Sequence, residues 1–230
     1  MQVALCILTK NEYLCLKELI PNILESCRKN NITEIYGIDG GSTDGTLDLY
    51  SKNNIKIFKQ KSKGRGHAFQ LAFKNIVADL YIFFSPDGNE NEKDFGKFIE
   101  LSNKGYGVVI ASRMMKESFN EEDDQLIKLR KWANNIFNLM ANLFFRKDGP
   151  YITDSINGYR SITREVADVL KLDAVDYTIE YQMTIRAMKK KIKITEFPTI
   201  EGKRLYGETQ AKSIPTGIRF IKCFLRELFN

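Results

Sequence analysis

Short, almost wholly apolar segments alternate with longer segments of helical periodicity through the first half of this chain. The apolar segments are residues 3–8, 34–38, 55–58, 80–84 and 108–112. Strands that are apolar at nearly every position are buried on both faces, as in a parallel sheet covered by helices. The alternation therefore predicts an α/β fold with a mainly parallel central sheet flanked by helices, whose ligands bind beyond the carboxyl ends of the strands.

The second half departs from this rhythm after an acidic stretch at 116–124, which we interpret as a loop. An amphipathic helix is predicted from Gln125 to Arg146. The remaining predicted elements are a loop at 148–160, helices near 164–171 and 178–190, a strand at 193–197, a polar loop from Thr199 to Ser213 and a closing helix. A length of 230 residues favours one domain spanning residues 1–230.

Composition excludes several classes of protein. With 43% hydrophobic and 28% charged residues, the chain has the balance of a soluble globular protein rather than a disordered one. It lacks an apolar run of about eighteen residues and a signal-peptide pattern, so we expect it in the cytoplasm. Its four cysteines, Cys6, Cys15, Cys27 and Cys223, lack metal-site or disulfide spacing and are predicted to be buried thiols.

The net charge of +6 is concentrated near the end of the chain. From Arg186 onward there are eleven basic residues against four acidic ones. A basic end on an otherwise balanced chain suggests an anionic partner, such as a phosphate group or a membrane surface. No nucleic-acid-binding motif accompanies the charge, so nucleic acid is not expected as a partner.

Three polar loops follow predicted strands. The segment from Ile38 to Thr46 reads IDGGSTDGT, a tight turn rich in acceptors and glycine. A helix N-cap accounts for one of its polar residues, whereas a nucleotide-binding role accounts for the whole string, because a carboxylate at a strand end accepts hydrogen bonds from a base or ribose.

The second loop, Ser85 to Asn89 (SPDGN), puts the carboxylate of Asp87 and the amide of Asn89 two residues apart. This pair suits Mg²⁺ or Mn²⁺ if diphosphate oxygens complete the coordination shell; a simple Pro-Asp-Gly turn is the alternative. The third loop, Lys63 to Gly66 (KGRG), precedes a helix, where free amides and basic side chains would attract an anion.

The order of these loops resembles the family 2 glycosyltransferases, in particular the dolichyl-phosphate mannose or glucose synthase and polyprenyl-phosphate branch. That family shows P-x-x-N-E, V-D-D-G-S-x-D-G-T, K-G-x-G, D-A-D-x-Q, G-S-R, a helix arginine, S-G-F-R and R-x-x-G-E-S-K in sequence. The corresponding segments here are TKNE (9–12), 38–46, 63–66, 85–89, ASR (111–113), Arg130, NGYR (157–160) and RLYGETQ (204–210).

The resemblance implies a GT-A fold and an inverting, metal-dependent transfer of a hexose from a UDP- or GDP-linked sugar. It implies a nucleotide-sugar-binding half at 1–113 and an acceptor-binding half with the closing helix at 114–230. The implied nucleotide-sugar ligands are Thr9, Asn11, Glu12, Asp39, Gly41, Lys63, Ser85, Pro86 and Arg204. Asp87 and Asn89 would hold Mg²⁺ or Mn²⁺, and the implied catalytic residues are Asp87, Arg113, Arg130 and Asp154.

Three positions depart from the family pattern. Gly40 replaces the second Asp of D-D-G-S, Ser85 replaces the first Asp of D-x-D, and Gln210 stands where lysine is usual. The first weakens any prediction of the nucleotide base, and the second leaves the metal with fewer ligands. A catalytically weak, nucleotide-binding relative is therefore an alternative to an active enzyme.

The acceptor is predicted from what the nucleophile needs. A sugar hydroxyl requires a positioned base, for which Asp154 and Glu180 are candidates, whereas a polyprenyl phosphate is already ionised and requires cations. The arginines, which bind phosphate oxygens bidentately, favour a polyprenyl or dolichyl phosphate, and a saccharide hydroxyl of a surface polysaccharide or glycoconjugate is the alternative.

The closing helix bears on the same choice. At 100° per residue, one half carries Ile218, Phe220, Ile221, Phe224, Leu225, Leu228 and Phe229, and the other carries Arg219, Lys222 and Arg226. Such a helix either lies on an anionic membrane surface, as in a peripheral protein at the inner face of the membrane, or packs on the domain. The helix from Gln125 to Arg146 invites the same two interpretations.

Overall fold

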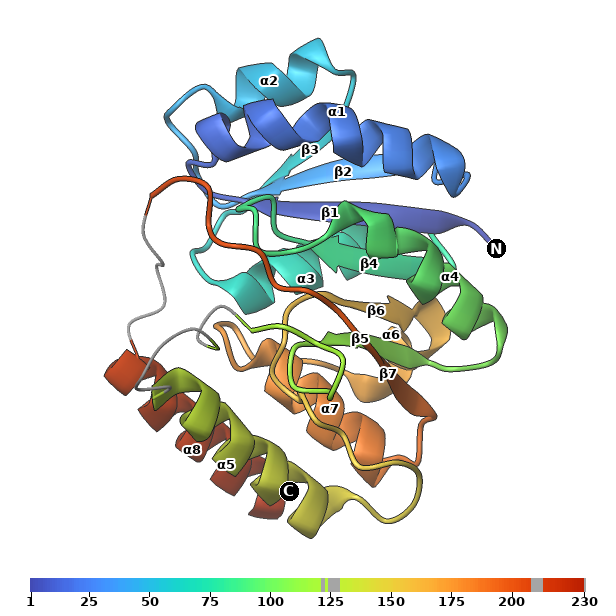
Figure 1. The fold of residues 1–230 in the computed structure, drawn as a ribbon, viewed down its shortest axis with the longest axis vertical. Coiled ribbons are helices and arrows are strands. Elements are labelled where there is room, and N and C mark those ends of the chain that lie inside the picture. The colour runs from blue at the N-terminus through green and yellow to red at the C-terminus, as the bar shows by residue number, and fades with distance from the viewer. Residues whose placement is uncertain (121–122, 124–128, 208–212, 230) are drawn as a thin grey trace.

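The computed structural model describes residues 1–229 except 121–122, 124–128 and 208–212. One seven-stranded sheet in the order β3-β2-β1-β4-β6-β5-β7 organises this part of the chain (Figure 1). Its strands are β1 (Val3–Thr9), β2 (Glu34–Asp39), β3 (Lys56–Lys59), β4 (Leu80–Phe84), β5 (Val108–Ser112), β6 (Arg160–Thr163) and β7 (Ile194–Pro198). All neighbouring strands pair in parallel except β6, which is antiparallel to both β4 and β5.

Helices cover both faces of the sheet. They are α1 (Tyr13–Lys29), α2 (Thr46–Lys52), α3 (Arg65–Asn75), α4 (Phe95–Asn103) after a short 3-10 turn η1 (Glu92–Asp94), α5 (Leu129–Phe145), α6 (Arg164–Leu170), α7 (Ile179–Lys189) and α8 (Ser213–Phe229). Two buried apolar clusters lie on opposite faces, one with α1, α2 and α4, the other with α3, α6, α7 and the inner sides of α5 and α8. Alternate residues of β1 point into each cluster, which is why every position of that strand is apolar or buried.

The mainly parallel sheet is confirmed, and the strands at 80–84 and 108–112 have the predicted bounds. The strand β6 was not predicted. Two of its four residues are the polar Arg160 and Ser161, which are nevertheless fully buried, so the segment carries no apolar signal. The carbonyl oxygens of Ser155, Asn157 and Glu180 accept hydrogen bonds from the Arg160 guanidinium, which makes its burial tolerable.

Strand register brings the polar loops to one edge. Thr9 pairs with Asp39 between β1 and β2, Asp39 pairs with Lys59 between β2 and β3, and Ile7 pairs with Phe84 between β1 and β4. The segments that follow these strands therefore start at the same level of the sheet. This edge is the carboxyl end, where the sequence predicts ligand binding.

The helices α5 and α8 lie side by side beyond α7 (Figure 1). Their facing aromatic rings are in contact, with 5.2 Å between the ring centroids of Phe137 and Phe220 and 5.3 Å between those of Phe144 and Phe224. The predicted start of the α5 helix, at Gln125, lies outside the described residues. Gln210, the third departure from the family pattern, lies outside them too. The four cysteines are buried thiols, as predicted. Among the described residues, no helix is long and apolar enough to cross a bilayer.

Candidate active site

The loop after β2 is shaped by its own acidic residues. The carboxylate of Asp39 is 1% exposed and accepts hydrogen bonds from the amides of Gly41 and Ser42, both at 2.9 Å. Gly41 has a φ of 93°, which only glycine adopts without strain. Asn11 ties the loop after β1 to this turn, because its Oδ1 accepts from the amide of Thr43 at 2.8 Å. Asn11, Asp39 and Gly41 thus set the backbone at the strand ends.

A cavity of about 360 Å³ opens at these strand ends, and we call it the strand-end cavity. It brings together six of the nine residues predicted to bind the nucleotide sugar, with Asp87 beside them. The six are Thr9, Glu12, Lys63, Ser85, Pro86 and Arg204. Asn11, Asp39 and Gly41 are not among its lining residues, so their contribution is to the shape of the loop rather than to the described wall.

The glycines of the KGRG loop serve a close packing contact. A Cβ at Gly64 would lie 2.1 Å from the carbonyl oxygen of Val175, and one at Gly66 would lie 2.0 Å from that of Ala174. The amide of Gly66 donates to Val175 at 3.1 Å. The prediction that free amides here attract an anion is therefore wrong for Gly66, whose amide is occupied; Lys63 does line the strand-end cavity.

The pair Asp87 and Asn89 fits a divalent cation in a limited way. The Oδ1 atom of Asn89 is buried and has no hydrogen-bond partner in the part of the chain that the structure describes, which is unfavourable unless a ligand uses it. Across the described residues there is no group of three or more His, Cys, Asp or Glu side chains that could hold a metal. The donors therefore suit Mg²⁺ or Mn²⁺ only when other oxygens, such as those of a diphosphate, complete the shell.

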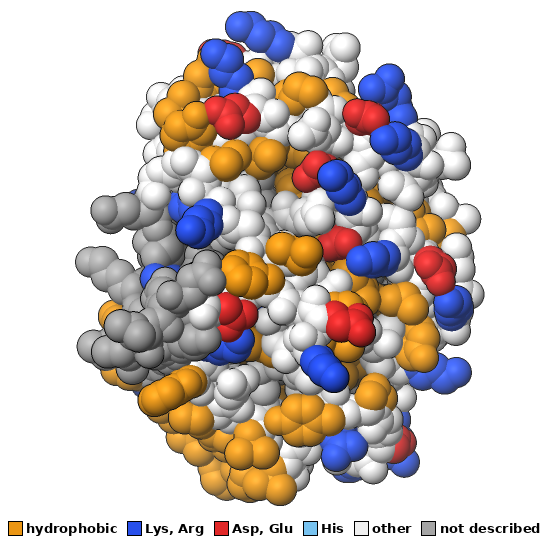
Figure 2. All heavy atoms as spheres, viewed as in Figure 1, with side chains coloured by type: hydrophobic (Ala, Val, Ile, Leu, Met, Phe, Trp, Pro, Cys, Tyr) orange, Lys and Arg blue, Asp and Glu red, His pale blue; other side chains and the backbone are white. Residues whose placement is uncertain are grey.

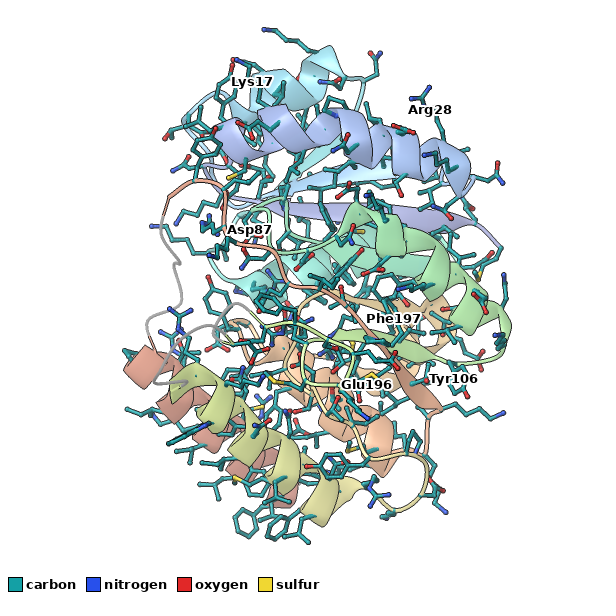
Figure 3. All side chains as sticks on the ribbon, in the orientation of Figure 1. Lys17, Arg28, Asp87, Tyr106, Glu196 and Phe197 are labelled. Carbon is teal, nitrogen blue, oxygen red and sulfur yellow. The ribbon has the colours of Figure 1, made fainter. Side chains whose placement is uncertain are left out.

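The segment that leaves β7 crosses the loop after β4 and is tied to it at several points. The amide of Leu205 donates to the carbonyl oxygen of Asp87 at 2.9 Å, and that of Gly202 donates to Asn89 at 3.0 Å. Figure 3 labels Asp87 beside this segment. The guanidinium of Arg204 then joins Asp87 and Glu12, at 2.9 and 2.6 Å. Burial raises the pKa of Glu12, and the hydrogen bond and charge of Arg204 oppose that rise.

A second cavity, of about 400 Å³, lies between the loop after β4 and the helices α5 and α8; we call it the inter-helix cavity. Asp87 and Asn89 line its inner end together with Arg113 and Arg130, while Phe137 and Phe220 belong to its helical wall. The two cavities adjoin, because four residues line both: Arg65, Ser85, Asp87 and Tyr177. The inter-helix cavity thus combines an apolar end with a charged one, where the three arginines Arg65, Arg113 and Arg130 lie among carboxylates.

Arg113 is fixed by two acidic residues. Its Nε and Nη2 donate to Asp154 at 2.8 and 3.0 Å, and its Nη1 donates to Glu201 at 3.1 Å. These charges raise the pKa of Arg113 against the effect of burial. Asp154 is fully buried and lines neither cavity. The structure therefore places the predicted base against the guanidinium of Arg113 and outside the lining of both cavities.

Two further groups line the cavities although no role was assigned to them by motif. The carboxyl of Glu90 accepts from the amide of Ser85 at 2.7 Å, and burial raises its pKa to about 8. Arg65 forms an ion pair with Glu180, which is 2% exposed. Arg65 stands at the variable position of KGRG, so only its charge could have drawn attention to it. Glu90 carries no sequence signal, because acidic residues are common after a turn.

Comparison with known proteins gives the family. The model for "Glycosyl transferase family 2" matches residues 4–168, which include the loops after β1, β2 and β4. The chain belongs to glycosyl transferase family 2. Glycosyltransferase AglJ of Haloferax volcanii is 29% identical over 232 residues, covering 99% of this chain and 73% of the relative.

Two further relatives act, by their names, on lipid phosphates. The dolichol-phosphate mannosyltransferase of Pyrococcus furiosus is 27% identical over 92% of this chain and 60% of its own length. The UDP-N-acetylglucosamine–dolichyl-phosphate N-acetylglucosaminyltransferase of Methanococcus voltae is 27% identical over 79% of this chain and 80% of its own. The branch predicted from the ordered motifs is thus confirmed among the relatives.

The fold also matches solved glycosyltransferases. Glucosyl-3-phosphoglycerate synthase of Mycobacterium tuberculosis, solved with Mn²⁺, UDP and phosphoglyceric acid, superposes with a TM-score of 0.74 at 16% identity, covering 99% of this chain and 78% of that one. At this identity the likeness concerns the fold alone. It confirms the single GT-A domain that the resemblance implied.

Proposed function

We propose that this protein is an inverting glycosyltransferase that moves a hexose from a UDP- or GDP-linked sugar to a polyprenyl or dolichyl phosphate. The observation that carries the proposal is the junction of the two cavities at Asp87. One cavity offers polar strand-end loops suited to a nucleotide, and the other offers arginines beside an apolar wall. This pair of environments suits a nucleotide sugar and a lipid phosphate whose reacting groups meet at Asp87.

On the donor side, residues 1–113 supply the wall of the strand-end cavity except for the segments around Tyr177, Arg204 and Arg219. Lys63 and Arg204 would offset the negative charge of the diphosphate. Asp87 and the Oδ1 atom of Asn89 would hold Mg²⁺ or Mn²⁺ against the diphosphate oxygens. Such a cation, when bound, stabilises the negative charge that develops on the departing nucleoside diphosphate.

On the acceptor side, Arg113 and Arg130 face the inter-helix cavity. A phosphate monoester held there is already ionised, so no side chain has to remove a proton. One of its oxygens forms the new bond to the anomeric carbon while the bond from that carbon to the diphosphate oxygen breaks, and the electron pair leaves with the nucleoside diphosphate. Asp154 then positions Arg113, and this assignment replaces the role of a general base.

The orientation of α5 supports a lipid acceptor. Its inward residues include Asn138 and Asn142, which are 1% and 4% exposed and hydrogen-bond residues 152–155. Its exposed residues include Arg130 and Asn135 but also five large apolar side chains: Trp132, Ile136, Leu139, Leu143 and Phe144. Figure 2 shows hydrophobic side chains gathered at the lower end of the molecule, where α5 lies. An outward apolar face on a helix whose inner side already packs on the domain is suited to a membrane surface.

The closing helix packs on the domain through one side and leaves apolar residues exposed on the other. Phe220, Cys223 and Phe224 of α8 are buried against the domain, whereas the apolar residues Ile218, Ile221, Leu225 and Phe229 stay exposed beside α5. We call the exposed apolar residues of α5 and α8 the two-helix face. Arg219 is half exposed near this face. We therefore propose peripheral attachment through the two-helix face to the cytoplasmic, inner face of an anionic membrane.

The direct test is transfer by the purified protein. Incubation with labelled UDP- or GDP-hexoses, Mn²⁺ and a polyprenyl phosphate is expected to yield a labelled lipid that is extracted with the acceptor. Labelled saccharide in place of labelled lipid would move the assignment to the hydroxyl-acceptor alternative. Failure of transfer and of donor hydrolysis with every nucleotide sugar would instead support a nucleotide-binding relative without catalysis.

A further inference from the structure

Arg65 occupies a distinctive position between the two cavities. Among the basic side chains in the described part of the chain, it alone lines both the strand-end cavity and the inter-helix cavity. Lys63 and Arg204 line only the first, and Arg113 and Arg130 only the second. We propose that Arg65 is a catalytic residue that contacts the departing diphosphate and the acceptor phosphate at the same time. This inference rests on the proposed function, because it requires two anionic ligands.

The guanidinium of Arg65 is held in place from three sides. Its Nε forms the ion pair with the buried Glu180 at the start of α7. Its Nη1 lies 3.2 Å from the hydroxyl oxygen of Ser85. A Cβ on Gly158 would lie 2.1 Å from its Nη2. Glycine at 158 therefore leaves room for the guanidinium, and the side chain cannot shift far toward that loop.

The residue at 85 explains why the charge of Arg65 is available to a ligand. The related pattern D-x-D has an acidic residue at this position, whereas this chain has Ser85. A carboxylate in place of the hydroxyl would form a second ion pair with Arg65 on the cavity side. The neutral hydroxyl leaves Glu180 as the one anionic hydrogen-bond partner of Arg65 among the contacts described, with Glu90 also lining the inter-helix cavity. Serine at 85 thus removes a metal ligand and, in the same step, spares Arg65 a second ion pair.

The reaction itself requires a cation at this point. A nucleoside diphosphate and a phosphate monoester in adjoining cavities repel one another, and the repulsion is strong where water is excluded. A guanidinium has five N–H donors in a planar fork, so it can bind oxygen atoms of two anions at once. Because Arg65 is already ordered by Glu180 and Ser85, little reorganisation accompanies the contact. Its contribution should therefore appear as coupling between the two ligands.

The coupling is measurable without catalysis. Calorimetry would give the Kd of farnesyl phosphate with and without saturating UDP or GDP and Mn²⁺. The measurement would compare the wild type with R65Q/E180Q, which removes both members of the ion pair. K29Q/E25Q, which removes an exposed ion pair of α1 and likewise leaves the net charge unchanged, is the matched control. In the wild type and K29Q/E25Q, we expect the nucleotide to change this Kd by less than about threefold, whereas in R65Q/E180Q it should weaken binding at least about tenfold.

The outcomes separate the two proposals. If the wild-type protein binds nucleotide but not farnesyl phosphate, the acceptor assignment is wrong, and the proposed role of Arg65 is wrong with it. Binding in both proteins with the same coupling would overturn the role of Arg65 alone. Should R65Q/E180Q not fold, S85D decides, because it neutralises Arg65 from the cavity side and leaves Glu180 paired. The proposal expects the same loss of about tenfold there, and unchanged coupling in S85D would refute it.

Discussion

Arg204 and Asp87 are joined by an ion pair of 2.9 Å across 117 positions of the chain. The same guanidinium bonds Glu12 at 2.6 Å, so one side chain connects the loop after β1, the loop after β4 and the segment after β7. Asp87 is also the carboxylate proposed to hold the metal. A divalent cation and a guanidinium cannot share one carboxylate without repulsion, so metal binding is expected to displace Arg204 toward the diphosphate.

Replacing Arg204 therefore should separate metal binding from nucleotide binding. In Arg204→Gln, we expect Mn²⁺ to bind about tenfold more tightly in the absence of nucleotide, because Asp87 has lost its competing cation. UDP or GDP should bind more weakly, because a phosphate partner is missing. Titration of Mn²⁺ followed by electron paramagnetic resonance, with the exposed Arg146→Gln as control, measures the first effect. Weaker Mn²⁺ binding in Arg204→Gln would contradict the competition.

The pair Arg113 and Asp154 gives a second prediction. Asp154→Asn leaves a partly buried arginine short of its bidentate partner and should lower the free energy of unfolding by about 2 kcal/mol. Transfer should fall as far as it does in Arg113→Gln, and the double variant should be no worse than Arg113→Gln, because Asp154 acts through Arg113. Urea unfolding and kcat/KM check both parts. A base role would show instead as a much larger loss of kcat in Asp154→Asn than in Arg113→Gln.

The raised pKa of Glu90 leads us to expect that the free energy of unfolding depends on pH. Its pKa is raised from 4.5 to about 8 in the folded protein, mainly by burial, so the folded state binds a proton that the unfolded state releases. Stability in EDTA should therefore fall as pH rises from about 4.5 to about 8, and level off above that range. Glu90→Gln imitates the neutral carboxyl and should lose this fall. Parallel curves of urea midpoint against pH for the two proteins would show that Glu90 does not titrate in this range.

The two-helix face predicts binding to lipid vesicles. Leu143 and Trp132 on α5 are 72% and 63% exposed, so Leu143→Glu and Trp132→Glu should change stability little. Each should weaken sedimentation with anionic phospholipid vesicles about tenfold or more while leaving nucleotide binding intact. Val77→Glu, at a 78% exposed apolar residue outside α5 and α8, is the matched control. An equal loss in Val77→Glu would indicate general repulsion by added negative charge.

Sequence predicted those features that depend on neighbours along the chain. The apolar strands and the loops after β1, β2 and β4 were recognisable because glycine, acidic residues and apolar runs repeat a local pattern. Contacts between distant residues were not recognisable from one sequence. Asp154 has the residue type of a base. Its bond to Arg113, which lies 41 positions away along the chain, is visible only in the structure, and the proposed positioning role rests on that bond. The buried polar strand β6 escaped prediction for the same reason, since distant carbonyl groups make its arginine tolerable.

The identity of the nucleophile is the central claim, and one comparison tests it most directly. Purified protein, Mn²⁺ and its preferred labelled nucleotide sugar would be incubated with a polyprenyl phosphate or with the corresponding free polyprenol. We expect labelled glycolipid from the phosphate alone, because the arginines of the inter-helix cavity recognise an anion. The candidate bases are engaged elsewhere: Asp154 lines neither cavity and binds Arg113, and Glu180, which lines the inter-helix cavity, is paired with Arg65. Comparable transfer to the free polyprenol would contradict the account.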